Sequence, residues 1–269
     1  MSRTPKRLLI IAIRAIGDVV LITPIIRQLR QTYPDAYLAA VADGPSAHIL
    51  LHNPLLNHVF VIDRRAKRLQ SRVSSFLEWI TFTLAIRREG FDTIIDLYSG
   101  PRSALLAWLS GAPDRYGEDV RSRGRGFFYN HPIPISRNRR HLIEQKFDLV
   151  QPLVGKIDVS QSQLDLYISE EETQQAHLLL SEIDVTSGRI IGLVPGAGSP
   201  WRMWPSTRFA ELADVLHQKF HATIILVGGT HDRLVCQDIR EQMNVQPLDL
   251  SGRTSLRELM AVLGQMDLV

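Results

Sequence analysis

The sequence predicts an α/β protein made of two Rossmann-like, doubly wound domains that face each other across a cleft. Continuous apolar runs such as residues 8–13 are typical of parallel strands buried on both faces, and they alternate with helical patterns. The same alternation begins again after residue 188. Each half opens with a strand and a glycine-containing turn, and open α/β sheets bind ligands just beyond the carboxyl ends of their strands.

The first half alternates strands and helices from residue 8 to residue 109. Strands are expected at residues 8–13, 37–41, 59–62 and 91–97. Helices are expected at residues 20–33, 64–88 and 103–109. Gly90 suits the C-terminus of the second helix, because glycine readily adopts a left-handed conformation. These elements form a first domain of residues 1–165, and a junction at residues 166–188 follows it.

The second half, residues 189–269, repeats the pattern. Strands are expected at residues 189–194, 223–227 and 248–250. Pro205 suits the first turn of the helix after the first of these strands. Ser255 and Glu258 have the spacing of a capping box, in which each side chain bonds the backbone N–H of the other residue.

Residues 263–269 are typical of the end of a helix and the first residues of another buried strand. A strand that ends without a partner leaves backbone N–H and C=O groups unpaired. A doubly wound domain usually has about five or six strands. We therefore expect residues 189–269 to be the first part of a second domain that is incomplete in this chain.

The composition is that of a globular protein of a reducing cytoplasm. Hydrophobic residues make up 45% of the chain, yet no run of about 18 apolar residues, long enough to span a membrane, occurs in it. Cys236 is the single cysteine, which excludes an internal disulfide and suits a reducing compartment.

Charge is distributed unevenly along the chain. Residues 1–150 contain 22 Lys and Arg against 13 Asp and Glu, whereas residues 151–269 contain 9 against 15. A basic first half favours an anionic partner such as a phosphate, a carboxylate or an anionic lipid. A solubilising surface explains the same excess, and charge alone leaves both interpretations open.

Asp18 is the first candidate for chemistry. It follows the first strand in the turn to a helix, and Gly17 beside it permits a close approach. A carboxylate at this edge can accept a proton from a substrate hydroxyl. An ordinary helix N-cap, whose oxygen bonds the amides of the first turn, is the alternative interpretation.

The second candidate is the loop at residues 195–205, between a strand and a helix. Its small residues let backbone N–H groups approach an anion, the helix N-terminus adds a partial positive charge and Arg202 adds a full one. Such a loop suits a diphosphate. It lacks the Gly-Lys-Ser/Thr of a Walker motif, and glycines that only close a loop are the alternative.

Two basic tracts lie in the first half, at residues 64–68 and 121–126. Their likeness to nucleic-acid-binding tracts is superficial, and we predict no nucleic-acid partner. The second tract precedes three aromatic residues at 127–129, so it equally suits an anionic membrane surface. Histidine pairs with i, i+4 spacing lack a third ligand, so we predict no metal site.

Five short motifs occur in a recognisable order along the chain. They are Ala15-Ile16-Gly17-Asp18-Val19-Val20 with Pro24; Asp96-Leu97 with Gly100, Arg102–Ala107 and Gly111; His141-Leu142-Ile143-Glu144; Pro195–Pro205; and Ser251–Leu256. Together they resemble glycosyltransferase family 9, the ADP-heptose:lipopolysaccharide heptosyltransferases. The resemblance covers essentially the whole chain.

The resemblance implies a GT-B fold, with the acceptor on the first domain and an ADP-sugar mainly on the second. It implies inverting transfer of a heptose or related sugar to a hydroxyl of an acidic lipopolysaccharide-core acceptor, with Asp18 as the general base. Arg202 takes the place of the family's usual lysine beside the leaving diphosphate, and no cofactor is implied. A monomer is expected in the cytoplasm, with peripheral contact to the inner membrane as an extension of that expectation.

Further site residues follow from the resemblance. The donor diphosphate is assigned to Gly196, Ala197, Gly198, Ser199 and Arg202. The nucleotide base is assigned to the region of Gly228, Gly229, Gly252, Thr254 and Ser255. The acceptor is assigned to Arg14, Gly17, Arg102, Arg121 and Arg123.

The chain departs from the family pattern at two points. Arg14 stands near a position where many members have a small or hydroxyl residue, which leaves the acceptor preference open. The family's Asp-x-Gly-x-x-His segment, a second anchor for the ADP-sugar, is absent from this sequence, so we expect weak donor binding and no measurable transfer by the chain as given. A non-catalytic binding remnant and another GT-B nucleotide-sugar enzyme, such as an epimerase, are the alternatives.

Overall fold

The computed structural model describes residues 4–62, 72–120, 126–136, 140–159, 162–182 and 188–269. The chain divides into two compact units, Met1–Tyr167 and Ile168–Val269. Each unit is a parallel β-sheet with helices on its faces, so the predicted α/β fold class is confirmed.

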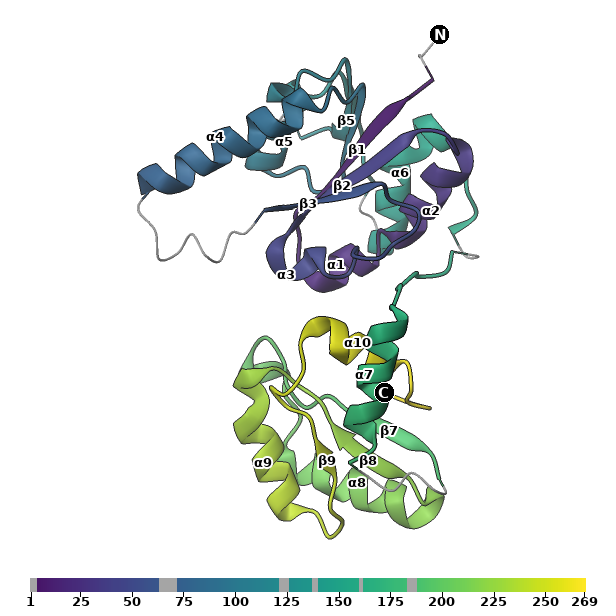
Figure 1. The fold of residues 1–269 in the computed structure, drawn as a ribbon, viewed down its shortest axis with the longest axis vertical. Helices are drawn as coiled ribbons and strands as arrows, with labels where there is room; N and C mark the ends of the chain where they lie inside the picture. The colour runs from purple at the N-terminus through teal and green to yellow at the C-terminus, as the bar shows by residue number, and fades with distance from the viewer. Residues whose placement is uncertain (1–3, 63–71, 121–125, 137–139, 160–161, 183–187) are drawn as a thin grey trace. The chain divides into compact units, whose positions relative to one another are not determined.

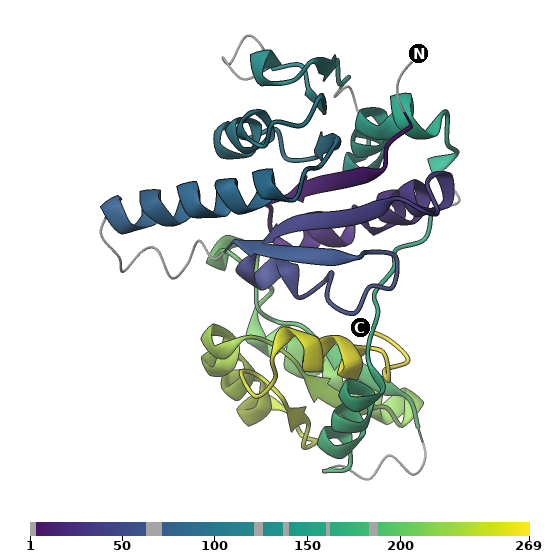
Figure 2. The ribbon, with the colours of Figure 1, turned by 45° about the horizontal axis from the view of Figure 1, so that its top comes forward.

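The sheet of the first unit has six parallel strands in the order β3-β2-β1-β4-β5-β6. Strands β1, β2 and β3 can be followed side by side in Figure 2. Its strands are β1 Arg7–Ala12, β2 Tyr37–Asp43, β3 His58–Ile62, β4 Thr93–Asp96, β5 Asp114–Glu118 and β6 His131–Ile133. The order along the sheet reverses between β1 and β4. Doubly wound sheets bind their ligands at such a reversal, beyond the carboxyl ends of the two strands.

Helices cover both faces of this sheet (Figure 1). They are α1 Ile16–Val20, α2 Thr23–Thr32, α3 Gly44–Ala47, α4 Arg72–Arg88, α5 Pro101–Leu109 and α6 Leu142–Val154, with a short 3₁₀ turn, η3, at Gly126–Phe128. Helices α4 and α5 pack on the face that carries Leu9 and Ile11 of β1. Helices α2 and α6 contact each other on the opposite face.

The first unit differs from the sequence prediction in two respects. The expected helix at residues 20–33 is split into α1 and α2, because Pro24 lies in the first turn of α2 and the Thr23 hydroxyl donates to the Val20 carbonyl oxygen at 2.8 Å. Strands β5 and β6 were not predicted, since both are short and neither contains a run of apolar residues. Gly90 has the expected left-handed conformation after α4, with φ of 63°.

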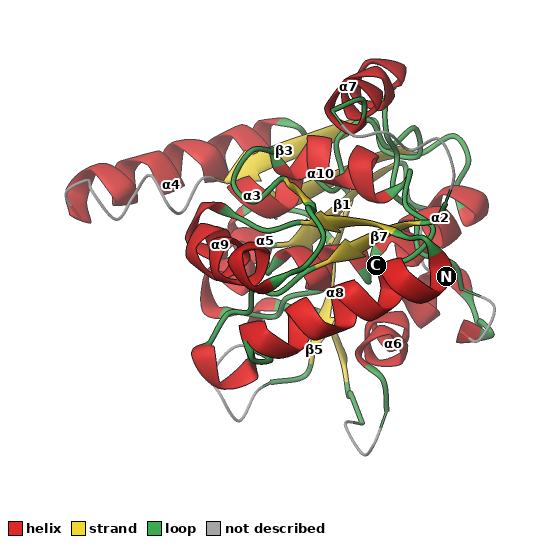
Figure 3. Ribbon diagram, turned by 90° about the horizontal axis from the view of Figure 1, so that it is seen from below, coloured by secondary structure: helices red, strands yellow, loops and turns green. Residues whose placement is uncertain are grey.

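The sheet of the second unit has the order β7-β8-β9, with strands at Ile190–Leu193, Thr223–Leu226 and Leu248–Asp249. Helices α8 Ser206–Phe220 and α9 Arg233–Gln242 pack on one face (Figure 3). Helices α7 Glu170–Leu180 and α10 Leu256–Leu263 pack on the other face. Short 3₁₀ turns, η5 Pro200–Arg202 and η6 Thr230–Asp232, follow β7 and β8.

Helix α7 lies within residues 166–188, which the sequence assigns to a junction, and it packs against α10 in the second unit. The Arg257 guanidinium donates to both carboxylate oxygens of Glu172, at 2.7 Å and 2.5 Å. Both side chains are largely buried, 9% exposed for Arg257 and 14% for Glu172. The Arg257 contact lowers the pKa of Glu172 to about 2.

The last residues of the chain are paired with β7. The Asp267 N–H donates to the Ile190 carbonyl oxygen at 2.9 Å, and the Gly192 N–H donates to the Leu268 carbonyl oxygen at 2.8 Å. Leu268 thereby forms a parallel bridge with Ile191. The expectation that the backbone lacks a partner here is wrong, because β7 has an edge not used by β8.

Candidate active site

Asp18 lies at the reversal point of the first sheet. It is the third residue of α1, which begins directly after β1 and the short segment at residues 13–15. Ala15, not Asp18, occupies the N-cap position, so the N-cap interpretation of Asp18 is wrong. The Asp18 side chain is 25% exposed, and its Oδ2 lies 3.2 Å from Nε of Arg14. The carboxylate is therefore partly accessible and paired with one cation.

A cavity of about 240 Å³ opens beside this pair. Segments that follow β1, β4, β5 and β6 line it together with one side of α6. Its polar lining residues are Arg14, Tyr98, Ser99, Glu118, Gln145 and Lys146. The cavity therefore presents two cations and one carboxylate at the carboxyl edge of the first sheet.

Asp96, at the end of β4, holds the wall of this cavity in place. Its side chain is fully buried, and its Oδ2 accepts a 2.6 Å hydrogen bond from the Tyr129 hydroxyl. Its Oδ1 accepts from the backbone N–H groups of Tyr98 and Ser99 at 2.9 and 2.8 Å. Burial raises the pKa of Asp96, and these hydrogen bonds partly offset the rise. Asp96 thus fixes the turn that brings Tyr98 and Ser99 to the cavity.

Lys146 was not identified from the sequence. It lies on α6 directly before Phe147, which is buried, and its ammonium donates to the Leu97 carbonyl oxygen. Burial lowers the pKa of Lys146, and the nearby Arg14 lowers it further. A lysine among the buried positions of an amphipathic helix is the sequence signal that could have found it.

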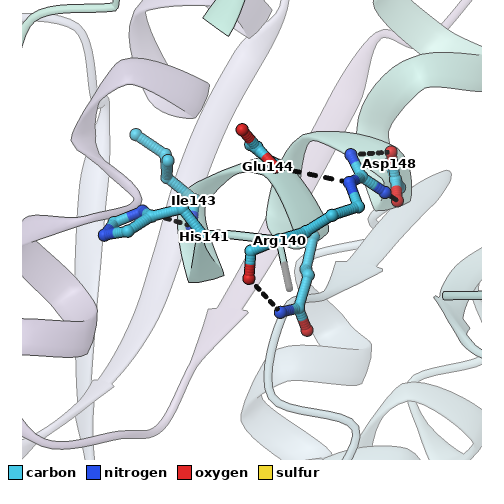
Figure 4. Close-up of polar contacts among 6 residues, drawn as sticks. Arg140, His141, Ile143, Glu144 and Asp148 are labelled. Atoms are coloured by element: carbon cyan, nitrogen blue, oxygen red, sulfur yellow. Dashed lines mark hydrogen bonds and ion pairs between the residues drawn. The ribbon is translucent and has the colours of Figure 1, made fainter. Parts of the chain in front are cut away.

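The start of α6 is fixed by a polar network (Figure 4). The Arg140 guanidinium donates to both oxygens of Asp148, at 2.5 and 3.1 Å, and to Glu144 at 3.3 Å. His141 is the N-cap of α6, and its Nδ1 accepts from the Ile143 N–H. The His141–Glu144 motif therefore positions the helix that carries Lys146.

Three loops meet at the carboxyl edge of the second sheet. The loop after β7 contributes Gly196, and a methyl group added there would lie 2.2 Å from Oδ1 of Asp232, in the turn after β8. Asp232 Oδ2 also accepts from the Gly229 N–H at 2.7 Å. The Gly252 N–H, after β9, donates to the Gly228 carbonyl oxygen at 2.9 Å. The structure thus brings together glycines that the sequence assigned to the diphosphate and the base.

Arg202 ends the 3₁₀ turn η5 and is exposed. Within the part of the chain that the structure describes, its guanidinium forms no hydrogen bond or ion pair, so all its donors can reach a ligand. Trp201 beside it is 96% exposed. Ala197 and Gly198 of the same loop are also exposed, and a methyl group at Gly198 would meet no atom within 4 Å.

The remaining predicted residues differ in their placement. Ser255 is the N-cap of α10, and its hydroxyl accepts from the Glu258 N–H, which confirms the capping box. Thr254, directly before it, is partly exposed. Arg102 is exposed in the first turn of α5, and Gly17 faces open space. Arg121 and Arg123 lie outside the described residues.

Arg233 and Asp232 were missed by the sequence reasoning. The Arg233 guanidinium donates to the Gly252 carbonyl oxygen at 2.8 Å, and so ties the turn after β8 to the loop after β9. A polar residue soon after a glycine pair was the available signal. Among the described residues no cluster of metal-ligating side chains is found. In the same residues no helix has the length and hydrophobicity needed to cross a membrane.

Comparison with known proteins supports the family resemblance. The model of glycosyltransferase family 9 (heptosyltransferase) matches residues 79–269. The chain is 23% identical over 257 residues to lipopolysaccharide heptosyltransferase 3 of Escherichia coli, across 94% of this chain and 73% of that protein.

Solved structures agree. A family 9 glycosyltransferase from Veillonella parvula has a TM-score of 0.87 and 26% identity, over 98% of this chain and 75% of that one. Heptosyltransferase WaaC of E. coli, solved with ADP-2-deoxy-2-fluoro heptose, has a TM-score of 0.74 and 22% identity over 97% of this chain and 80% of that one, which shows the shared GT-B fold. The chain therefore belongs to glycosyltransferase family 9, the heptosyltransferase family.

Proposed function

We propose that this protein transfers a heptose, or a closely related sugar, from an ADP-sugar to a hydroxyl of a lipopolysaccharide-core acceptor. The observation that carries the proposal is the position of Asp18, in a chain of this family. It lies where the strand order of the first sheet reverses, next to a cavity lined by the cationic side chains of Arg14 and Lys146. The names of the relatives support the sugar and the acceptor.

Asp18 is the general base in this proposal. Its carboxylate accepts the proton of the acceptor hydroxyl as that oxygen attacks the anomeric carbon of the donor sugar. The bond from that carbon to the diphosphate breaks in the same step, so ADP leaves and the anomeric configuration inverts. The partial exposure of Asp18 supports this role, because a substrate hydroxyl can reach it.

The second unit binds ADP in this proposal. The amides of the Gly196–Ser199 loop, whose Ala197 and Gly198 are exposed, and the exposed Arg202 guanidinium suit the two phosphates, which gain negative charge as the sugar leaves. Arginine keeps the charge of the family's usual lysine and adds a planar fork of donors. The loops that contain Gly228, Gly229 and Gly252 are the region proposed for the nucleoside.

The acceptor site is in the first unit. Arg14 and Lys146 suit an acidic, phosphate- or carboxylate-bearing core sugar. The excess of basic residues in the first half supports contact with a negatively charged membrane surface, where a glycolipid acceptor is held. We therefore place the protein in the cytoplasm, peripherally on the inner membrane.

The test is a transfer assay with ADP-heptose and lipopolysaccharide from bacteria that lack core heptose, using purified protein in which the family's Asp-x-Gly-x-x-His segment follows residue 269. We expect ADP release that depends on the acceptor, and a product heavier by one heptose in mass spectrometry. NMR of the product gives the anomeric configuration, and inversion is expected. Transfer from UDP- or GDP-sugars at the same rate, or retention of configuration, would contradict the proposal.

A further inference from the structure

We propose that the cavity of the first unit binds an anionic oxygen group of the acceptor sugar, a carboxylate or a phosphate, between Lys146 and Arg14, and that Arg14 leaves Asp18 to do so. The inference rests on the proposed function, in which this unit binds the acceptor. It goes further in naming Lys146, the binding cavity and the event that frees the base.

Lys146 has a charge without a close counter-ion. Among the described residues its ammonium donates to one group, the Leu97 carbonyl oxygen, and no carboxylate lies within the 4 Å of an ion pair. The carboxylates of Asp96, Glu118 and Asp18 act on it only from farther away. Burial disfavours the charged form of Lys146, so a bound anion would stabilise that form. Two N–H donors of the ammonium have no partner among the described residues and can bind such an anion.

Arg14 has the complementary geometry. Its guanidinium carbon lies 5.2 Å from the centre of the Tyr98 ring, and its Nε lies 3.2 Å from Oδ2 of Asp18. The side chain is 43% exposed and lines the cavity, so it can turn towards a ligand there. A planar guanidinium binds the two oxygens of a carboxylate or phosphate with parallel hydrogen bonds, which one carboxylate contact through Nε does not provide.

The remaining lining makes the cavity suitable for a sugar and not only for a free anion. Glu118 and Gln145 supply oxygen acceptors for sugar hydroxyls, and the ring of Tyr98 supplies an apolar wall. Glu118 also repels a second negative charge. Two cations and one carboxylate together favour a ligand with a single anionic group.

Binding of that group changes the state of the base. Without a ligand, the Arg14 guanidinium is paired with Oδ2 of Asp18. This contact uses a lone pair that Asp18 needs to accept a proton as a general base. An anion held by Lys146 offers Arg14 a second, bidentate partner. The acceptor would thus free Asp18 at the moment when its own hydroxyl needs a base.

Calorimetry of the 269-residue protein without donor tests the binding step. The probes are glucuronate, glucose 6-phosphate and glucose, at constant ionic strength. We expect one or both anionic sugars to bind, and glucose to bind at least about tenfold more weakly, since a charged contact of about 1.4 kcal/mol corresponds to that factor. The preferred probe distinguishes a carboxylate from a phosphate. Equal affinity for glucose and for both anions would overturn the proposal.

Two lysine variants locate the site. Lys146→Met should weaken binding of the anionic probe by about tenfold or more. Lys156→Met, at an exposed lysine of the same unit, should leave the affinity for the probe unchanged. Lys146→Arg should retain binding, and circular dichroism checks that each variant is folded. Unchanged affinity of folded Lys146→Met would place the probe elsewhere and overturn the proposal.

The release of Arg14 is tested by NMR of the arginine Nε–H groups. The Arg14 signal, assigned with Arg14→Lys, should shift when the anionic probe binds and stay constant with glucose. A constant signal during saturable, Lys146-dependent binding would disprove the release. None of these measurements uses a donor or sugar transfer, so they can fail while the transfer assay succeeds, and the reverse.

Discussion

The carboxyl edges of the two sheets present opposite chemistries. At the first sheet, charged side chains surround a cavity, with Arg14 and Lys146 opposed by Glu118 and Asp18 close by. At the second sheet, glycine-rich loops present backbone, and the one side-chain cation of the loop after β7, Arg202, is exposed. The second unit has a buried ion pair, Glu172–Arg257, which stabilises the start of α10. Helix α10 follows the loop that contains Gly252, which is proposed to bind the nucleoside.

The difference indicates what each unit recognises. A cavity lined by side chains can distinguish the shape and charge of a sugar, because each lining group is specific to one ligand atom. Backbone N–H groups with an exposed cation suit a diphosphate, which all ADP-sugars share. We therefore expect substitutions in the first unit to change turnover or acceptor choice, and those in the second to change donor affinity or stability.

The largest effect is expected for Asp18→Asn. Asparagine keeps the shape but cannot accept the hydroxyl proton, so turnover should fall by about 10²- to 10⁴-fold. ADP affinity should change little, because the substitution is in the first unit. Steady-state kinetics of transfer and calorimetry with ADP measure the two quantities, in protein in which the family's Asp-x-Gly-x-x-His segment follows residue 269.

Asp35→Asn is the matched control, since Asp35 is an exposed aspartate of the same unit. Its turnover should match that of the wild type. Turnover of Asp18→Asn within a few-fold of the wild type would remove Asp18 from the mechanism and weaken the contrast between the units.

The second effect concerns the Glu172–Arg257 ion pair, which joins α7 to α10. Glu172→Gln leaves the Arg257 charge buried without its partner, and should lower the free energy of unfolding by about 2–4 kcal/mol at pH 7. The folded pKa of Glu172, about 2, lies below its ordinary value of 4.5, so this stabilisation is complete above pH 4.5 and lost as the pH falls towards 2.

Urea unfolding followed by circular dichroism, from pH 7 to pH 2.5, measures this difference. The difference in the free energy of unfolding between wild type and Glu172→Gln should become smaller below pH 4.5. Glu171→Gln, at an exposed neighbour in the same helical turn, should have nearly the wild-type free energy of unfolding at every pH. A gap that does not depend on pH would show that the Glu172 charge is not what stabilises α7 against α10.

The third effect is on donor affinity. In protein extended by the Asp-x-Gly-x-x-His segment, Arg202→Ala should weaken ADP binding by about 10- to 100-fold, because a charged hydrogen bond contributes about 1.5–3 kcal/mol. Arg202→Lys should retain much of the affinity. Arg208→Ala, at an exposed arginine that pairs with Glu211, is the control and should bind ADP normally. Equal ADP affinity in Arg202→Ala and wild type would assign the diphosphate to other groups.

The sequence located most of the loops that meet at the carboxyl edge of the second sheet, and only Arg14 among the charged residues that line the cavity of the first. Glycines, strand ends and caps have local signals, and Ser255 with Glu258 was located correctly because a capping box spans only four residues. The cavity of the first unit depends on tertiary contacts. Lys146 is far along the chain from Arg14, and strand β5, which brings Glu118 to the same cavity, has no apolar pattern to reveal it. The site residues themselves stay predictions until the variants are measured.

The smallest effect compares two glycines of one loop. Neither Gly196 nor Gly198 has a positive φ, so alanine is compatible with both backbones. At Gly196 the new methyl group would meet the Asp232 carboxylate at 2.2–2.7 Å and displace it from the Gly229 N–H, whereas at Gly198 it would meet nothing. Gly196→Ala should therefore cost about 1–2 kcal/mol of stability, and Gly198→Ala less than about 0.5 kcal/mol. Thermal unfolding of the two variants measures this, and equal stabilities would show that Asp232 does not hold the loops of the second unit together.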